Sequence, residues 1–415
     1  MKYLIITFGC QMNRSDSERI ASVLEQAKLK ETLEIKEADF IIINMCSVRQ
    51  SAVDRVNGIF ENTKNQKSIK ILTGCVLKKD AKKFAEKFDY VLDIKDLPKW
   101  SKILKINQSR SPVHGTASYF GVEAKQTSKF TATIPIMTGC NNFCTYCVVP
   151  YTRDRETSRP HQEIICEIEK LIENGYKEIW LLGQNVNSYS DISFSKLLRK
   201  INKVPGNFWI RFTSSHPKDF SEELIKTIKE CDKVTEYLNL PVQAGDDEIL
   251  KKMNRPYKIK KYLEIIKKVR KEIPNICIST DVIVGFPGET KKQFQNTAKL
   301  FKEVRYDMAY INKYSPRTGT KAAELKDTAS NTEKKERETF LNNILKKTAL
   351  ENNRKYIGKE VEALIDARKD KENWVGKTRE YKTIIVKSKN NLMGKFIKTK
   401  ITDATSWGLK GEDVK

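Results

Sequence analysis

The cysteines in the middle of the chain have the spacing with the clearest chemistry. Cys140, Cys144 and Cys147 form a Cys-x-x-x-Cys-x-x-Cys pattern directly after a strand-like run at residues 134–138. Three thiolates on one tight loop can hold three irons of a cubane [4Fe–4S] cluster. Because no fourth cysteine lies nearby, the pattern predicts a cluster with one iron left open for a substrate or cofactor.

Other metal sites fit this spacing less well. A zinc site more naturally shows two Cys-x-x-Cys pairs or added histidines. The only three histidines are His114, His161 and His216, and none of them neighbours the cysteine loop. An electron-transfer ferredoxin normally supplies a fourth cysteine. A cluster with an open iron is therefore the better interpretation.

Three further cysteines occupy similar places near the N-terminus. Cys10, Cys46 and Cys75 each follow the end of a predicted strand, and these strands lie at residues 2–8, 40–44 and 69–73. In open α/β sheets ligands bind at the carboxyl edge of the strands, so residues far apart in the sequence can converge there. Taken singly, each of the three could be a buried core thiol.

The other three of the nine cysteines, Cys166, Cys231 and Cys277, are isolated within helix or strand patterns. We expect them to be small buried hydrophobic residues. Structural disulfides are not expected, because the cytosol is reducing.

The strands that position these cysteines form two successive α/β blocks. Residues 1–106 alternate strand-like and helix-like stretches, which predicts an open parallel sheet with right-handed crossovers. A polar stretch at 107–129 indicates a linker. Residues 130–350 contain six further strand–helix units, which predict a partial (β/α)6 barrel with its chemistry at the strand C-termini. Its strands are expected at 134–138, 178–182, 208–212, 236–240, 276–284 and 308–314.

The C-terminal block, residues 351–415, is richer in short β runs separated by glycine-containing turns. Strands are expected at 360–365, 383–386 and 394–401, as in a small β-barrel. Residues 376–410 hold nine Lys or Arg and two acidic residues. A solvated surface explains part of this excess, but basic residues on short strands near Phe396 and Trp407 favour RNA binding.

The net charge is the feature of the overall composition that says most about possible partners. Lysine and arginine number 77 against 53 acidic residues, a formal balance of +24. Such an excess favours a polyanionic partner, nucleic acid above all, through counterion release. The alternative is the lysine-rich composition typical of an AT-rich genome. No apolar run reaches the roughly 18 residues that a membrane helix needs, and no signal peptide is evident, so a soluble cytoplasmic protein without a membrane partner is expected.

The cysteine loop, with an aromatic residue (Tyr146) before its last cysteine and its place after the first barrel strand, resembles that of the radical S-adenosylmethionine (radical SAM) superfamily. In that superfamily the amino and carboxylate groups of S-adenosylmethionine chelate the open iron. One electron from the cluster then cleaves the sulfonium to give a 5′-deoxyadenosyl radical, which can attack an unactivated C–H bond. The resemblance therefore implies S-adenosylmethionine as a cofactor.

Over nearly its whole length the chain resembles the methylthiotransferases, most closely the tRNA-modifying MiaB type. The segments that match the family's three N-terminal cysteine motifs are Gly9-Cys10-Gln11-Met12-Asn13, Asn44-Met45-Cys46-Ser47-Val48-Arg49 and Gly74-Cys75-Val76. The resemblance implies that Cys10, Cys46 and Cys75 hold an auxiliary [4Fe–4S] cluster, also with an open iron, so that the chain carries two clusters. The C-terminal block resembles the TRAM domain, an RNA-binding β-barrel of tRNA-modifying enzymes.

Family-like segments also follow the predicted barrel strands. By resemblance, the residues expected to contact S-adenosylmethionine or the target base are Tyr146, Gln184, Arg211, Ser214 and Gln243. Each could instead be a loop residue that satisfies backbone groups. The sequence departs from the family at Asp154, where glycine is usual, and at Ala244 and Asp246, which replace serines. These departures affect substrate contacts rather than the reaction class.

The resemblance implies an enzyme that converts N6-isopentenyladenosine, beside the anticodon in tRNA, to its 2-methylthio derivative, with S-adenosylmethionine as methyl donor and radical source. Its expected partners are the tRNA anticodon stem-loop and an electron donor such as flavodoxin or ferredoxin, and a monomer is expected. The alternatives are methylthiolation of threonylcarbamoyladenosine in tRNA or of a ribosomal-protein aspartate, and a non-catalytic iron–sulfur protein that binds RNA. Residues 10–13 and 184–187 look like the isopentenyladenosine type, and the basic tail favours RNA.

Overall fold

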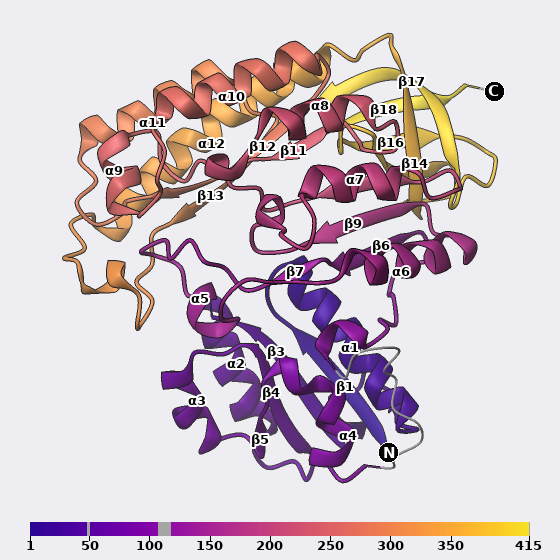
Figure 1. Ribbon diagram of the computed structural model, residues 1–415, viewed down its shortest axis with the longest axis vertical. Coiled ribbons are helices and arrows are strands. Elements are labelled where there is room, and N and C mark those ends of the chain that lie inside the picture. Colours follow the sequence, from indigo (N-terminus) through magenta and orange to yellow (C-terminus); the bar gives the residue numbers. More distant parts are fainter. Residues whose placement is uncertain (48–49, 107–117, 415) are drawn as a thin grey trace.

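The computed structural model describes residues 1–47, 50–106 and 118–414. The chain forms an N-terminal α/β unit, a central unit of strand–helix repeats and a C-terminal β-barrel, which confirms the predicted fold class (Figure 1). In Figure 1 the indigo N-terminal unit lies below the central unit, and the yellow β-barrel lies at its upper right. Residues 107–117 of the expected linker, and Val48 and Arg49 of the second cysteine motif, fall outside the described residues.

The N-terminal unit is a five-stranded parallel sheet. Its strand order is β2 (Lys30–Glu31), β1 (Lys2–Thr7), β3 (Phe40–Cys46), β4 (Ile69–Cys75) and β5 (Tyr90–Val91). Every residue of β3 is buried, because a central parallel strand has helices against both faces. The helices are α1 (Gln11–Gln26), α2 (Gln50–Thr63), α3 (Lys78–Ala85) and α4 (Trp100–Ile103).

The central unit is a partial barrel of parallel strands. In order these are β6 (Thr131–Pro135), β9 (Glu178–Leu182), β10 (Trp209–Phe212), β11 (Tyr237–Asn239), β12 (Cys277–Val284) and β13 (Met308–Lys313). Strands β6, β9 and β10 pair in one sheet and β11, β12 and β13 in another, and a parallel bridge between Ile210 and Val234 joins the two. The strands lie within a few residues of the predicted positions.

Helices follow the central strands and bury one large apolar core against them. They are α6 (His161–Glu173), α7 (Phe194–Asn202), α8 (Glu222–Glu230), α10 (Ile259–Glu272), α11 (Lys291–Val304) and α12 (Asn331–Arg354). Short elements lie in the connections: β7 (Met137–Thr138), α5 (Val149–Thr152), β8 (Thr157–Ser158) and α9 (Asp247–Lys252). Single 3-10 turns occupy Ile35–Glu37, Ile94–Lys99, Tyr119–Gly121, Val186–Ser188, Pro217–Asp219 and Lys321–Glu324.

The C-terminal part is a closed five-stranded barrel. Its order is β14 (Glu360–Arg368), β15 (Asn373–Thr378), β16 (Thr383–Lys387), β18 (Gly408–Asp413) and β17 (Phe396–Thr405). Three of these strands were predicted, whereas β15 and β18 were not. Alternate side chains of the strands fill the interior, among them Ile365, Trp374 and Ile384.

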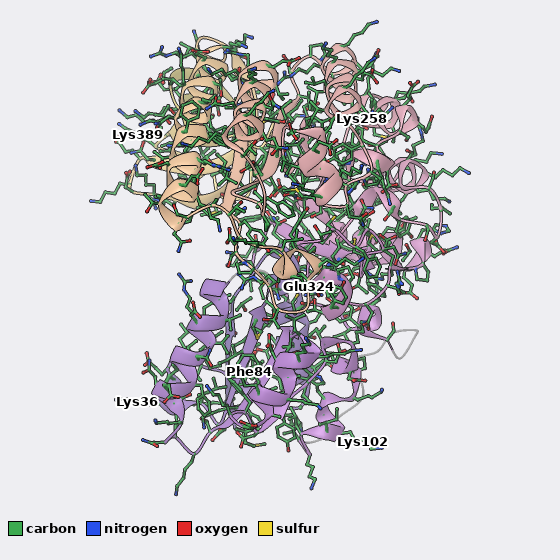
Figure 2. All side chains as sticks on the ribbon, turned by 90° about the vertical axis from the view of Figure 1, so that its left-hand side faces the viewer. Lys36, Phe84, Lys102, Lys258, Glu324 and Lys389 are labelled. Carbon is green, nitrogen blue, oxygen red and sulfur yellow. The ribbon has the colours of Figure 1, made fainter. Side chains whose placement is uncertain are left out.

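Positive charge is spread over the surface. Figure 2 shows Lys36, Lys102, Lys258 and Lys389 on different sides of the molecule, so the net charge of +24 does not define one nucleic-acid face by itself. Over the three described stretches of chain, no helix is long and apolar enough to cross a bilayer.

Candidate functional site

The N-terminal cysteine set, Cys10, Cys46 and Cys75, gathers at the carboxyl edge of the N-terminal sheet. Cys10 lies between β1 and α1, whereas Cys46 and Cys75 are the last residues of β3 and β4 and are partners in the sheet register. The backbone of Gly9 passes so close that an added Cβ would lie 2.9 Å from the Cβ of Cys46. The three cysteines predicted to converge therefore do so.

Two buried asparagines hold the first two motifs of this set together. The Asn13 amide donates to Asn44 Oδ1 at 3.0 Å and to the Met45 carbonyl at 3.1 Å. Asn44 donates back to the Asn13 carbonyl at 2.7 Å. Both asparagines are fully buried, so their polar atoms need these partners, and the exchange fixes the start of α1 against the end of β3.

Glycines set the backbone immediately before two of the cysteines. Gly74 and Gly139 have φ of +95° and +80°. A Cβ would lie 2.4 Å from the Met45 carbonyl oxygen at Gly74, and 2.0 Å from the Arg155 carbonyl oxygen at Gly139. Only glycine fits both the dihedral angle and the space.

The loop cysteine set, Cys140, Cys144 and Cys147, lies half-buried after β7 at the mouth of the central unit. Other segments hold this loop through its backbone. Asn254 donates to the carbonyls of Asn142 and Phe143, both at 3.0 Å. Burial, with the neighbouring Cys144, raises the pKa of Cys147 to about 12, so the free thiol is protonated and metal binding must displace its proton.

A buried arginine that follows the loop cysteine set contacts the N-terminal cysteine set, and Cys75 lies close enough to Cys147 for their charges to interact. Arg153, just after α5 and six residues beyond Cys147, donates from Nε to Cys75 Sγ at 3.1 Å. Its Nη2 donates to Asp16 of α1 at 2.5 Å. A hydrogen bond from Cys46, together with the charge of Arg153, lowers the pKa of Cys75 to about 6. The two sets therefore face one another across the junction of the N-terminal and central units.

The donor chemistry of each set fits an iron–sulfur cluster better than a single ion. Within the described parts of the chain, no group of three or more Cys, His, Asp or Glu side chains is arranged to hold one metal ion. In a cubane each thiolate binds its own iron, so the sulfurs need not meet at one point. All six candidate ligands are thiols, which are the usual ligands of such clusters.

Three of the other predicted site residues lie on the loops that follow central strands. Gln184 follows β9, and its buried Oε1 has no hydrogen-bond partner among the described residues. Ser214 and Gln243 follow β10 and β11 with φ of +64° and +69°. Left-handed backbone in residues other than glycine is costly and concentrates at functional sites. The strand ends thus carry the strain and the free polar atoms expected of a ligand site.

Sequence reasoning gave no role to two residues of this region. His216 is buried, its Nδ1 accepts the Lys218 backbone N–H at 3.2 Å, and its Nε2 has no partner among the described residues. Arg255 is also buried, and its Nη1 lies 3.5 Å from the Tyr146 hydroxyl and 3.8 Å from Cys144 Sγ. The only signal for Arg255 was its family-like segment Met253-Asn254-Arg255.

Arg211, also expected to contact cofactor or base, does not lie with the other candidates on the strand-end loops. Ile210 of β10 faces the central core, so the alternation of the strand turns Arg211 to the opposite face. There its fully buried guanidinium donates to Glu178 at 2.5 Å and to the carbonyls of Thr378 and Arg379 at 2.7 and 2.6 Å. Arg211 therefore fixes the C-terminal barrel to the central unit.

The expected burial of isolated cysteines holds for Cys231 and Cys277 but was wrong for Cys166. Cys166 is exposed on α6, because the buried positions of that helix are Ile164 and Ile168 and residue 166 falls between them.

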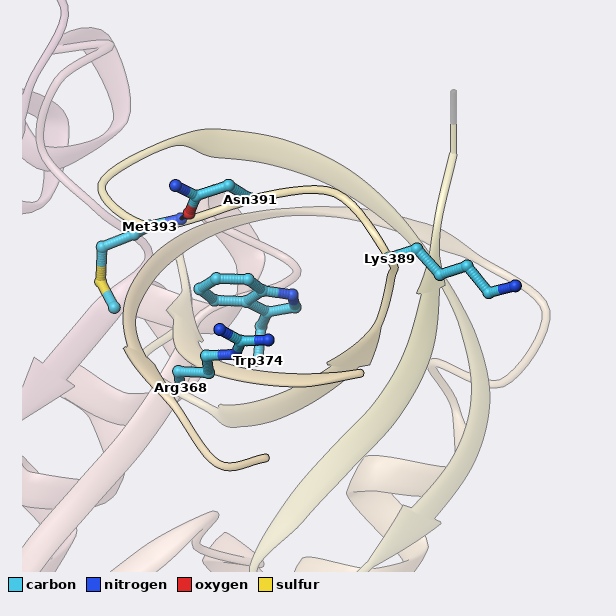
Figure 3. A pocket seen from close by; sticks show the side chains of 5 residues that line it. All are labelled: Arg368, Trp374, Lys389, Asn391 and Met393. Carbon is cyan, nitrogen blue, oxygen red and sulfur yellow. Dashed lines mark hydrogen bonds between the residues drawn. The ribbon is translucent and has the colours of Figure 1, made fainter. Parts of the chain in front are cut away.

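The C-terminal barrel carries a pocket of about 420 Å³. Its lining residues are Arg368, Trp374, Lys389, Asn391 and Met393 (Figure 3). The Arg368 guanidinium carbon lies 5.1 Å from the centre of the Trp374 ring, and Lys389 projects from the rim. Sequence reasoning missed this pocket because its residues come from three separate segments.

Comparisons with known proteins match three consecutive regions of the chain. The Radical SAM superfamily matches residues 134–301, the family described as Uncharacterized protein family UPF0004 matches residues 2–94, and the TRAM domain matches residues 354–414. The chain is 42% identical over 433 residues to a tRNA-2-methylthio-N(6)-dimethylallyladenosine synthase of Thermoanaerobacter pseudethanolicus, covering 99% of this chain and 92% of that protein. It is 39% identical over 441 residues to the protein of that name from Clostridium botulinum, covering 100% and 97%.

Among solved structures, the chain is similar to the radical S-adenosylmethionine methyltransferase TsrM from Kitasatospora setae. The TM-score is 0.57 at 15% identity, and the alignment covers 78% of this chain and 75% of that one. At this identity the likeness concerns the fold alone.

Proposed function

This chain belongs to the MiaB-type family of radical SAM methylthiotransferases, and from that membership we propose that it adds a methylthio group to C2 of N6-isopentenyladenosine beside the anticodon of tRNA. The observation that carries the proposal is the placement of two three-cysteine sets on opposite sides of one junction, where Arg153 of the central unit contacts Cys75 and where the charges of Cys75 and Cys147 interact. A reaction that needs both a radical and a sulfur source requires two such sites within reach of one substrate.

In this proposal each cysteine set holds one [4Fe–4S] cluster. The loop cysteine set, Cys140, Cys144 and Cys147, would hold the cluster that binds S-adenosylmethionine, and the N-terminal cysteine set, Cys10, Cys46 and Cys75, would hold the auxiliary cluster. When bound, these groups supply radical chemistry at a C–H bond and the sulfur for transfer. Three thiols in each set, with no fourth cysteine beside them, support one open iron per cluster.

The protein's own residues position these groups and exclude water. Arg255 and Tyr146 close one side of the loop cysteine set, and Arg255 also donates to the Pro241 carbonyl at 2.7 Å. Gln184, Ser214 and Gln243, at the ends of neighbouring strands, are the proposed contacts of S-adenosylmethionine or the target base. Their unpartnered or strained geometry supports this role.

The partners in the proposal are the tRNA anticodon stem-loop and an electron donor such as flavodoxin or ferredoxin, in the cytoplasm. The basic C-terminal barrel and the exposed Arg368 and Lys389 of its pocket support contact with RNA, because a guanidinium plane can stack on unpaired bases and cations bind phosphates. Phe143, on the loop between Cys140 and Cys144, packs against Tyr151 with ring centroids 6.0 Å apart, and Tyr151 is 37% exposed, which supports electron entry from the surface there.

Nucleoside mass spectrometry of tRNA tests the proposal. Cells without this protein are expected to accumulate N6-isopentenyladenosine and to lack its 2-methylthio derivative. Complementation with Cys144→Ala should fail, whereas Cys166→Ala, at an exposed cysteine outside both sets, should restore the derivative. Loss of 2-methylthio-threonylcarbamoyladenosine instead would replace the proposed substrate. An unchanged tRNA profile would turn attention to the ribosomal protein.

A further inference from the structure

Arg153 is held in place by two contacts of its own, through its backbone and through Asp16, before any cluster is considered. Its backbone N–H closes α5 by donating to the Val149 carbonyl at 2.8 Å. Its Nη2 pairs with Asp16 Oδ2 at 2.5 Å, while the other oxygen of that carboxylate accepts the Tyr119 hydroxyl, also at 2.5 Å. Arg153 is 3% exposed and Asp16 is fully buried. The guanidinium therefore has little freedom to rotate.

This anchoring directs the remaining Nε–H at a sulfur atom. The acceptor is Cys75 Sγ at 3.1 Å, and Cys75 is 4% exposed. Charges interact more strongly in such a dry environment than at the surface. The loop cysteine set has a weaker counterpart, because Arg255 Nη1 lies 3.8 Å from Cys144 Sγ. The two sets thus differ in how closely a cation approaches a ligand sulfur.

We propose that Arg153 is a positioning residue that raises the reduction potential of the auxiliary cluster by its hydrogen bond to Cys75. Because Arg153 belongs to the central unit and Cys75 to the N-terminal unit, this potential then depends on the contact between the two units. The inference rests on the proposed function, which assigns Cys75 to that cluster. Hydrogen bonds to ligand sulfurs are among the factors that set cluster potentials. A cationic donor stabilises the reduced cluster more than the oxidised one, since the reduced cluster carries one more negative charge.

The redox step concerned is the uptake of one electron by the auxiliary cluster from a low-potential chemical reductant, with no bond made or broken. It is measured in the full chain after Cys140, Cys144 and Cys147 are replaced by alanine, so that the auxiliary cluster alone remains. A potentiometric titration followed by electron paramagnetic resonance then gives its potential. Arg153→Lys keeps the positive charge and can still reach Asp16. Lysine has no guanidinium group, however, and therefore no Nε–H that could donate to Cys75 while the charge pairs with Asp16.

In Arg153→Lys the ratio of reduced to oxidised cluster at a fixed applied potential is expected to fall at least about tenfold. For a one-electron couple this corresponds to a reduction potential lower by about 59 mV. The matched control is Tyr119→Phe, which removes the other hydrogen bond of Asp16 and leaves the contact with Cys75 intact. Its ratio should change by less than about threefold, or about 30 mV by the same relation. A protein that merely lost packing would respond alike to both substitutions.

A measurement without substitution at Arg153 covers the case in which the lysine variant does not load iron. Arg317 also interacts with the N-terminal cysteine set, through Cys46, so the triple-alanine chain for this measurement carries Arg317→Lys as well. Labelled with 15N-arginine, this protein should show nitrogen hyperfine coupling to the reduced cluster in pulsed electron paramagnetic resonance. A loaded cluster with no such coupling, or an unchanged potential in Arg153→Lys, would overturn this inference alone. Failure of the triple-alanine chain to hold iron would overturn the assignment of the auxiliary cluster, and this inference with it.

Discussion

The guanidinium of Arg211 and the carboxylate of Glu178 pair at 2.5 Å within the central unit, where Arg211 also contacts the C-terminal barrel, and their side-chain exposures are 0% and 6%. Three aromatic rings, Trp180, Trp209 and Tyr381, surround the guanidinium at 5.1 to 5.8 Å. A charge pair in this setting has no water to replace a lost partner. The attachment of the barrel therefore depends on both residues.

Arg211→Ala is expected to lower the free energy of unfolding by about 3–5 kcal/mol, because it leaves Glu178 buried and unpaired. Urea unfolding followed by tryptophan fluorescence measures this loss, since Trp180 and Trp209 flank the site. The control is Arg199→Ala, whose partly exposed pairs with Glu223 and Glu230 are expected to contribute less than about 1 kcal/mol. If Arg211→Ala left the stability unchanged and weakened the binding of S-adenosylmethionine, Arg211 would have the cofactor contact expected from the sequence.

Local patterns were sufficient to predict the strands that carry the cysteines. The runs that become β3 and β4 are mostly apolar, and alternation with helices requires parallel pairing, which brings Cys46 and Cys75 side by side. Strands β15 and β18 were missed because Gly376, Gly408 and Gly411 give them low β-propensity. They are strands because the barrel must close around its core, which is a property of the whole domain.

Side-chain placement was harder to predict than the strands. Arg211 and Ser214 were both expected to contact S-adenosylmethionine or the target base, but Arg211 still belongs to β10, where alternation sends its side chain away from the strand-end loop that holds Ser214. The contact of Arg153 with Cys75 joins residues 78 positions apart in two units. No periodic pattern in the sequence encodes such a pairing.

The two cysteine sets should be separable by single substitutions. Cys75→Ala is expected to reduce the iron content of the reconstituted protein from about eight to about four per chain, while cleavage of S-adenosylmethionine to 5′-deoxyadenosine continues. Cys144→Ala should lose a similar amount of iron, and it should also no longer cleave S-adenosylmethionine. Anaerobic iron analysis and chromatography of the nucleoside measure both effects. Undiminished 5′-deoxyadenosine from Cys144→Ala would refute the role of the loop cysteine set.

His216 should make the protein less stable in mild acid. Burial, followed by the charges of Arg255 and Lys218, lowers its pKa to about 2 from an ordinary value of 6.5. Below pH 6.5 the unfolded chain takes up a proton at this residue and the native chain does not, so the free energy of unfolding falls as the pH falls. Between pH 7.5 and 5.5 this one group is expected to cost about 1.4 kcal/mol.

His216→Gln should remove that part of the pH dependence. Urea unfolding of the reduced metal-free protein at the two pH values, compared between wild type and variant, measures the difference. Equal slopes in the two proteins would mean that His216 takes up its proton over the same pH range in the native and the unfolded chain.

Asp154 occupies a backbone position that suits glycine, in agreement with the family's preference. Its φ is +60°, its carbonyl accepts the Cys140 N–H at 3.1 Å, and its carboxylate pairs with Lys95 at the surface. Asp154→Gly and Asp154→Val both remove this ion pair, but only valine adds a β-branched side chain to a left-handed position. We expect the valine variant to be less stable than the glycine variant by at least about 1–2 kcal/mol.

Lys95→Ala serves as the control for this comparison, because it removes the ion pair and leaves the backbone at Asp154 unchanged. An exposed pair of this kind contributes about 0–1 kcal/mol to the free energy of unfolding. Thermal unfolding and iron content should be measured together, since a shift of the Asp154 carbonyl also moves the Cys140 backbone. Equal stability of the glycine and valine variants would show that the dihedral angle at Asp154 is not a constraint.

The pocket of the C-terminal barrel should contribute to tRNA affinity through its positive charges. Arg368 lies over the Trp374 ring, and Lys389 extends the positive edge of the same pocket. Each cation that contacts a phosphate contributes about 0.7–0.9 to the slope of log affinity against log salt. The double variant Arg368→Ala, Lys389→Ala is therefore expected to reduce that slope by roughly 1–2 and to weaken binding most at low salt.

Filter binding of an isopentenylated anticodon stem-loop over a series of salt concentrations measures both quantities. The matched control is Lys36→Ala, Lys102→Ala, which removes two positive charges from the N-terminal unit, away from the pocket. Both variants lower the net charge by the same amount, so a general attraction between a basic protein and RNA would affect them equally. A larger change in slope for the pocket variant attributes the effect to Arg368 and Lys389, whereas equal changes would assign RNA binding to the overall charge of the chain.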